Sequence, residues 1–135
     1  MKKILLLLPV ILIFNACTYE KAALPVPNLT CVTDTVKHLA PVTIGDDFFN
    51  PQHLEIIAGD TVKWSYSTGS EAHTSTCDGT GGTTLPSGGT TWDSGVLSVG
   101  GTYKTAINVP GTYNYICTIH GAVMSGTIVV KARCQ

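Results

Sequence analysis

The stretch Pro110–Val130, PGTYNYICTIHGAVMSGTIVV, carries a strand pattern that ends at a cysteine. Successive side chains of a β-strand point to opposite faces, so Tyr113, Tyr115 and Cys117 share one face of a strand over Thr112–Cys117. If that face packs against the core, Cys117 lies buried at the end of the strand.

Two further side chains that bind soft metal ions follow that cysteine. His120 and Met124 are predicted to lie on a short loop before a last strand at Thr127–Lys131. A thiolate, an imidazole and a thioether would then converge, and this set of donors suits copper. A blue copper site uses one thiolate, two imidazoles and a weak axial Met, so a second imidazole is needed.

The second imidazole must come from one of three other histidines. His73 follows the strand that contains Trp64 after a short turn, so a hairpin can bring it to the end of the fold where Cys117 lies. His38 and His53 lie in the N-terminal approach and at a bend, where solvent-facing polar residues are common. We therefore expect His73 to be the ligand.

The rest of the chain reads as short strands separated by turns. β-rich runs alternate with Gly, Pro, Asn and Asp, and no helical period is long enough to predict a helix. Trp64 is predicted to be a core anchor, a strand is expected to begin near His73, and Asp78–Gly89 reads as a loop. The predicted strands are Val42–Ile44, Leu54–Ile57, Thr61–Ser65, Thr102–Val109, Thr112–Cys117 and Thr127–Lys131.

Length and composition restrict the class of protein. The 135 residues allow one domain of ordinary size. Charged residues make up 13% and the formal net charge is −1, which excludes a basic nucleic-acid binder. A hydrophobic content of 44% argues against an intrinsically disordered chain.

The N-terminus resembles an export signal. Lys2 and Lys3 precede Ile4–Phe14, an uncharged run of eleven residues. This run is too short to span a bilayer, which takes about 20 residues, but it fits the core of a signal peptide. It ends at Ala16-Cys17, which resembles the lipobox of bacterial lipoproteins, where the Cys becomes the lipidated first residue. Ordinary secretory cleavage nearby, with Cys17 a plain thiol, remains the alternative.

These features give a predicted organisation. Residues 1–16 are a signal peptide, residues 17–36 are the lipidated Cys17 and an N-terminal tether with two prolines, and residues 37–135 are the folded domain. We expect the protein to be exported and anchored by its lipid on the periplasmic side of a bacterial membrane. Disulfides persist in that compartment.

The motifs occur in the order found in a known family. They are Phe49-Asn50-Pro51 with Leu54-Glu55-Ile56, Gly59 to Trp64, His73-Thr74, Trp92 to Gly95, and Pro110 to His120. Over residues 42–131 the chain resembles the cupredoxins, in particular the plastocyanin and azurin-type blue copper proteins. The resemblance implies an all-β, Greek-key β-sandwich of about eight strands that transfers one electron at a time.

The resemblance also implies the ligands of one type 1 copper. His73, Cys117 and His120 are the equatorial ligands and Met124 is the axial ligand. Two features depart from the family pattern: the three residues between His120 and Met124, and the absence of an Asn beside His73. The hydrogen bonds around the thiolate sulfur are therefore not readable from the sequence.

The leading hypothesis is a monomeric, lipid-anchored electron carrier that meets redox protein partners and binds no nucleic acid. His120 would be the exit for the electron, and Gly121, Ala122 and Val123 would form a small apolar docking patch. The alternative is a periplasmic protein of the same fold that stores or delivers copper. A metal-free adhesive sandwich is a further reading. We do not expect an enzyme, because only one complete ligand set is visible.

Five cysteines leave three without a role once Cys17 and Cys117 are assigned. Cys31 precedes the first strand and Cys134 follows the last, so a disulfide between them would tie the two ends of the domain. Cys77 would then be a free, buried thiol. Pairing of Cys77 with Cys134 stays open, since connectivity does not follow from sequence.

Overall fold

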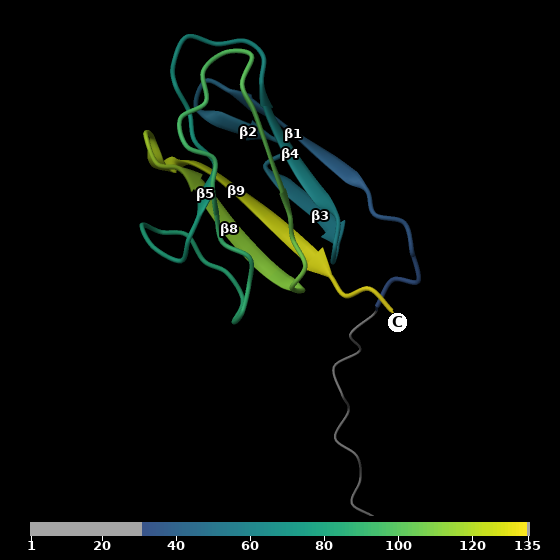
Figure 1. The fold of residues 1–135 in the computed structure, drawn as a ribbon. Coiled ribbons are helices and arrows are strands. Elements are labelled where there is room, and N and C mark those ends of the chain that lie inside the picture. Colours follow the sequence, from purple (N-terminus) through teal and green to yellow (C-terminus); the bar gives the residue numbers. More distant parts are fainter. Residues whose placement is uncertain (1–30, 135) are drawn as a thin grey trace, which may run out of the picture.

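Two β-sheets packed face to face form the domain. The computed structural model describes residues 31–134 and contains no helix in that range (Figure 1). Correspondingly, no helix in this range is long and apolar enough to cross a membrane. Its strands are β1 (Leu39–Gly45), β2 (Phe48–Asn50), β3 (His53–Ile57), β4 (Thr61–Tyr66), β5 (Thr76–Cys77), β6 (Trp92–Asp93), β7 (Thr102–Ala106), β8 (Gly111–Cys117) and β9 (Gly121–Lys131).

The strand order makes the structure a sandwich. One sheet has the order β2-β1-β4-β7 and the other β3-β9-β8-β5-β6. β1 pairs in parallel with β4, and β3 pairs in parallel with β9, so the chain crosses repeatedly between the sheets. The predicted all-β sandwich is confirmed, and the described part of the chain has one strand more than the eight expected.

Alternation along two strands builds the core. In β4, Val62, Trp64 and Tyr66 are buried, while the residues between them are half-buried. In β8, Tyr115 lies edge to face with Trp64 of the opposing sheet, and Tyr113 is tilted against Trp92 of β6 in its own sheet. The predicted buried face of β8 and the core position of Trp64 are both confirmed.

The start of β9 and the position of Met124 differ from the prediction. β9 begins at Gly121 rather than Thr127, so Met124 lies within a strand and its predicted loop position is wrong. The pairing continues past Tyr115, which is opposite Gly126, and shifts register at Cys117. A Cβ on residue 126 would overlap the Tyr115 ring, so this glycine serves close packing and does not end the strand.

The short strands β2 and β6 were not predicted, whereas β5 is the strand expected to begin near His73. β2 pairs antiparallel with β1 across a turn at Asp46 and Asp47, and Asp47 has a positive φ of 67°. β5 contains Cys77 and lies against β8, three residues after His73. Conversely, β7 ends at Ala106, before the predicted end at Val109.

The two ends of the described chain are joined. Cys31 and Cys134 form a disulfide, and Cys77 is a buried free thiol, as predicted. Val32 bridges Arg133, whose side chain also bonds the carbonyls of Asp34 and Val36. Residues 31–36 therefore belong to the folded part, although the tether was predicted to extend through residue 36.

The predictions for the export signal at residues 1–16, for a lipid on Cys17 and for the rest of the tether lie outside the described residues.

Candidate metal centre

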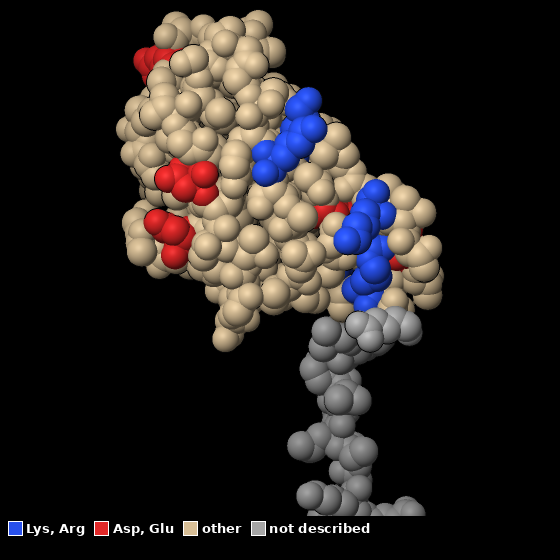
Figure 2. All heavy atoms as spheres, in the orientation of Figure 1, with Lys and Arg blue, Asp and Glu red and all other residues tan. Residues whose placement is uncertain are grey.

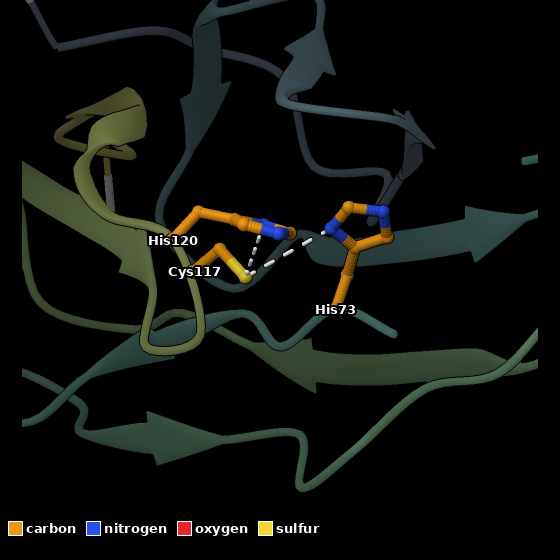
Figure 3. Close-up of side chains that lie close together, drawn as sticks. All are labelled: His73, Cys117 and His120. Carbon is orange, nitrogen blue, oxygen red and sulfur yellow. Dashed lines mark hydrogen bonds between the residues drawn. The ribbon is translucent and has the colours of Figure 1, made fainter. Parts of the chain in front are cut away.

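Three of the four predicted ligands meet at one end of the sandwich. The Sγ atom of Cys117 lies 3.5 Å from Nδ1 of His120 and 3.9 Å from Nδ1 of His73. The three donor atoms all lie within 4.8 Å of one another. In Figure 3 the sulfur lies below the His120 ring, and dashed lines join it to one nitrogen of each imidazole. One ion placed among these atoms would contact all three.

Different segments supply the donors. Cys117 ends β8, and His120 is in the turn to β9. His73 comes from the segment between β4 and β5, where its backbone exchanges hydrogen bonds of 3.1 and 2.7 Å with Leu97. Its ring is fully buried and packs edge-on against Tyr66, with the centroids 4.8 Å apart. The pairing with Leu97 therefore fixes His73 before any metal arrives.

The other two histidines lie elsewhere. His38 is exposed near Asp34 and Asp60, and His53 is exposed at the start of β3. Neither belongs to a group of donors with Cys117 among the described residues.

The environment of Cys117 favours the thiolate. Burial raises the pKa of this thiol, but the N–H of Thr74, which donates to Sγ at 3.3 Å, and hydrogen bonds from His120 and His73 lower it by more. The net result is a pKa of about 7, below the ordinary value. A thiolate is the form of Cys that binds a metal. The Thr74 N–H is the hydrogen bond to sulfur that the sequence did not reveal.

Met124 is fully buried in β9 and belongs to the same core cluster as Cys117. Its strand, β9, pairs with β8, which carries Cys117. Its role as the axial ligand stays a prediction.

The donor set fits copper better than zinc. Zinc sites in proteins use Cys, His and carboxylates, whereas a thiolate with two imidazoles and a nearby thioether is the blue-copper set. His73 and Cys117 are fully buried, and Nδ1 of His73 faces Sγ of Cys117 away from water. These donor atoms are suited to binding a small, soft metal ion.

Carboxylates lie behind both imidazoles. Oε2 of Glu71 is 2.8 Å from Nε2 of His120, and Oδ1 of Asp46 is 3.5 Å from Nε2 of His73. Asp47 approaches Nδ1 of His120 at 3.9 Å. Desolvation lowers the pKa of His120, but Cys117, Glu71 and Asp47 raise it by more. Sequence reasoning missed all three carboxylates, since no spacing pattern relates them to the ligands.

A family model matches most of the chain. The model of the copper-binding proteins of the plastocyanin/azurin family matches residues 36–131. No curated protein matches the chain in sequence.

Solved structures share the fold. Amicyanin from Paracoccus versutus is 20% identical with a TM-score of 0.53, over 69% of this chain and 81% of that one. A purple cupredoxin from Nitrosopumilus maritimus is 24% identical with a TM-score of 0.54, over 68% and 99%. A copper-containing nitrite reductase from Thermus scotoductus is 24% identical with a TM-score of 0.58, over 79% and 27%. At these identities the likeness concerns the fold alone.

Proposed function

This chain belongs to the plastocyanin/azurin family of copper-binding proteins, and from that premise we propose that it carries single electrons between redox proteins outside the cytoplasm. It is a blue copper protein, and its cofactor is one type 1 copper. We assign His73, Cys117 and His120 as equatorial ligands and Met124 as the axial ligand. The convergence of the two Nδ1 atoms on Cys117 Sγ is the observation that carries this proposal.

Bound copper would supply a one-electron change between Cu(II) and Cu(I). The chain's part is to keep the donors in place in both states. Cys117 is held by β8 and the Thr74 N–H, and His73 by its backbone pairing with Leu97. Because these contacts belong to the packed sandwich, little rearrangement is expected, and a small rearrangement keeps the barrier to electron transfer low.

His120 offers the route to the surface. Its side chain is 16% exposed, whereas His73 is fully buried. Val123, in β9 just after His120, is 83% exposed, and Ile119 is also exposed. Val123 belongs to the proposed docking patch of residues 121–123, and Ile119 extends that patch. A small apolar surface beside the exit suits a weak, transient redox encounter.

The proposed location rests on two features. The Cys31–Cys134 disulfide fits an oxidising compartment. The N-terminal pattern fits export and a lipid on Cys17. We propose a monomer anchored on the periplasmic side of a bacterial membrane.

The fold alone does not decide between a carrier and an enzyme. The nitrite reductase likeness spans only 27% of that protein, so its activity does not transfer to this chain. We propose no enzymatic activity, because the described residues present one ligand set with a thiolate.

Copper loading followed by redox cycling tests the carrier proposal. The purified protein is loaded with Cu(II), its copper content is measured, and it is cycled between ascorbate and ferricyanide. We expect one copper per chain that stays bound through repeated cycles. Several coppers per chain, or release of copper on reduction, would instead support storage or delivery.

A further inference from the structure

Glu71 contacts the exit histidine on the side away from the sulfur. Its Oε2 lies 2.8 Å from Nε2 of His120, while Nδ1 of the same ring lies 3.5 Å from Cys117 Sγ. We propose that Glu71 is a positioning residue for the metal centre: it accepts the Nε2–H of His120, frees Nδ1 for the metal and favours the oxidised state of bound copper. This proposal rests on the proposed function and names the residue that tunes its site.

The argument begins with the tautomer of the ring. A neutral imidazole carries one N–H, so one nitrogen donates and the other accepts. A carboxylate accepts only, and Glu71 therefore selects the tautomer with the proton on Nε2. That tautomer leaves a lone pair on Nδ1, which faces Cys117. A carboxylate that accepts a hydrogen bond from the other ring nitrogen fixes the orientation of a ligating His and raises its basicity.

The loop that carries Glu71 is itself fixed. The Asp46 carboxylate accepts the Ser70 N–H at 3.2 Å and the Tyr66 hydroxyl at 3.1 Å. Gly69 has a φ of 154°, and a Cβ there would overlap both the Tyr66 hydroxyl and the Asp46 carboxylate. Asp46 in the β1–β2 turn thus holds the residue next to Glu71. The Glu71 side chain is 55% exposed, and its carboxylate contacts His120.

No basic side chain neutralises Glu71. Within residues 31–134, its only ion-pair partner is His120, whereas Lys131 pairs with Glu55 and Arg133 with Asp60. On the face in Figure 2, Lys and Arg gather toward the right, and the carboxylates at the left edge stand apart from them. An uncompensated negative charge beside a ligand stabilises Cu(II) more than Cu(I).

The same carboxylate also belongs to a cluster with Asp47 and His120 whose donor atoms lie within 4.8 Å of one another. Because this cluster shares His120 with the Cys117 group, it is part of the same centre. We assign it a supporting role and not a second metal.

Two substitutions separate the charge from the hydrogen bond. Glu71→Gln keeps an oxygen acceptor for Nε2–H and removes the charge, and Glu71→Ala removes both. Glu55→Gln is the matched control, because it removes the same charge from the Lys131 pair on β3 and β9. We expect Glu71→Ala to weaken copper binding on the order of tenfold. This is the lower end of the loss in metal affinity when the hydrogen-bond partner of a ligating His is removed.

The reduction potential of the copper form is the measurement that tests whether Glu71 favours the oxidised state. We expect it to rise in both Glu71 variants and to stay unchanged in Glu55→Gln. A tenfold greater loss for Cu(II) than for Cu(I) corresponds to a rise of about 59 mV. Potentials equal to that of the control in both Glu71 variants would overturn the proposal.

The metal-free protein gives a reading that does not depend on copper. Long-range 1H–15N spectra at a pH of about 8.5, where imidazoles are neutral, report the tautomer of each His. We expect His120 to carry its proton on Nε2 in the wild type and in Glu71→Gln, and to become a mixture of tautomers in Glu71→Ala. An unchanged tautomer in Glu71→Ala would count against the proposal. Failure to form a blue site would instead overturn the proposed function and leave this reading intact.

Discussion

Nδ1 of His120 lies 3.5 Å from Sγ of Cys117, across the turn that joins β8 to β9. Thr74, the residue after His73, fixes this turn from the opposite side. Its N–H donates to Cys117 Sγ, and its hydroxyl accepts the N–H of Thr118 at 2.8 Å. One residue therefore links the segment of the first imidazole to the turn of the second. The donors are held together by the fold.

Thr74→Val tests this link. The change keeps the shape of a buried side chain but leaves the Thr118 N–H without its acceptor. We expect a loss of about 1–3 kcal/mol in the free energy of unfolding, and weaker copper binding. Urea unfolding and copper titration measure the two effects. Thr105→Val on β7 is the control, and equal losses in both variants would contradict the role of Thr74.

Met124→Leu tests the axial ligand. Leucine has a similar volume, so the core should lose less than about 1.5 kcal/mol. Loss of the thioether donor should weaken the binding of Cu(II) and shift the reduction potential upward, since the axial ligand tunes it. Electrochemistry on the copper form measures the shift. An unchanged potential would show that Met124 is only a core residue.

Val123→Asp tests the docking patch. Val123 is exposed beside the exit histidine, and a charge there should hinder close approach of a partner. We expect slower electron exchange with a redox protein while copper stays bound. Val36→Asp places the same charge on an exposed Val near the disulfide-linked end and should leave the rate unchanged. Equal rates in both variants would exclude the patch.

Asp60 predicts the acid dependence of stability. Burial raises the pKa of this carboxyl, but the N–H groups of His38 and Ile57 and the Arg133 guanidinium lower it by more. A folded pKa below the unfolded value means that the stabilisation is complete above the unfolded value, about 3.9, and is lost as the pH falls through the folded pKa.

Asp60→Asn should therefore lower the free energy of unfolding at pH 7 by about 1.5–3 kcal/mol and flatten its fall in acid. Urea unfolding of the metal-free protein from pH 7 to pH 3 measures both. Glu55→Gln breaks an exposed ion pair and should cost less than about 1 kcal/mol. A wild-type acid dependence in Asp60→Asn would refute the assignment.

Parts of the fold that depend on alternation were predictable from sequence. Tyr113, Tyr115 and Cys117 share a buried face because the side-chain period of a strand is two. The placement of His73 beside Cys117 followed from the same logic of strands and turns. The disulfide between Cys31 and Cys134 was the preferred pairing and is confirmed, although spacing alone left Cys77 as a competitor for Cys134.

Features that depend on tertiary packing were not predictable. The stretch from Gly121 to Gly126 has small residues that read as a loop, yet pairing with β8 makes it a strand and places Met124 inside it. Asp46 and Glu71 are far from Cys117 in sequence and reach the centre only because the β1–β2 turn and the loop before His73 meet there. Neither the composition nor the spacing of residues predicts which loops lie together in the fold.

The visible absorption spectrum tests the central claim most directly. A thiolate bound to Cu(II) in a site of this kind gives intense absorption in the red. We predict that the purified protein develops this absorption with one equivalent of Cu(II), and that Cys117→Ser, folded to the same extent by circular dichroism, does not. A colourless wild-type protein, or the same absorption in Cys117→Ser, would contradict the assignment of Cys117 as the thiolate ligand of a type 1 copper.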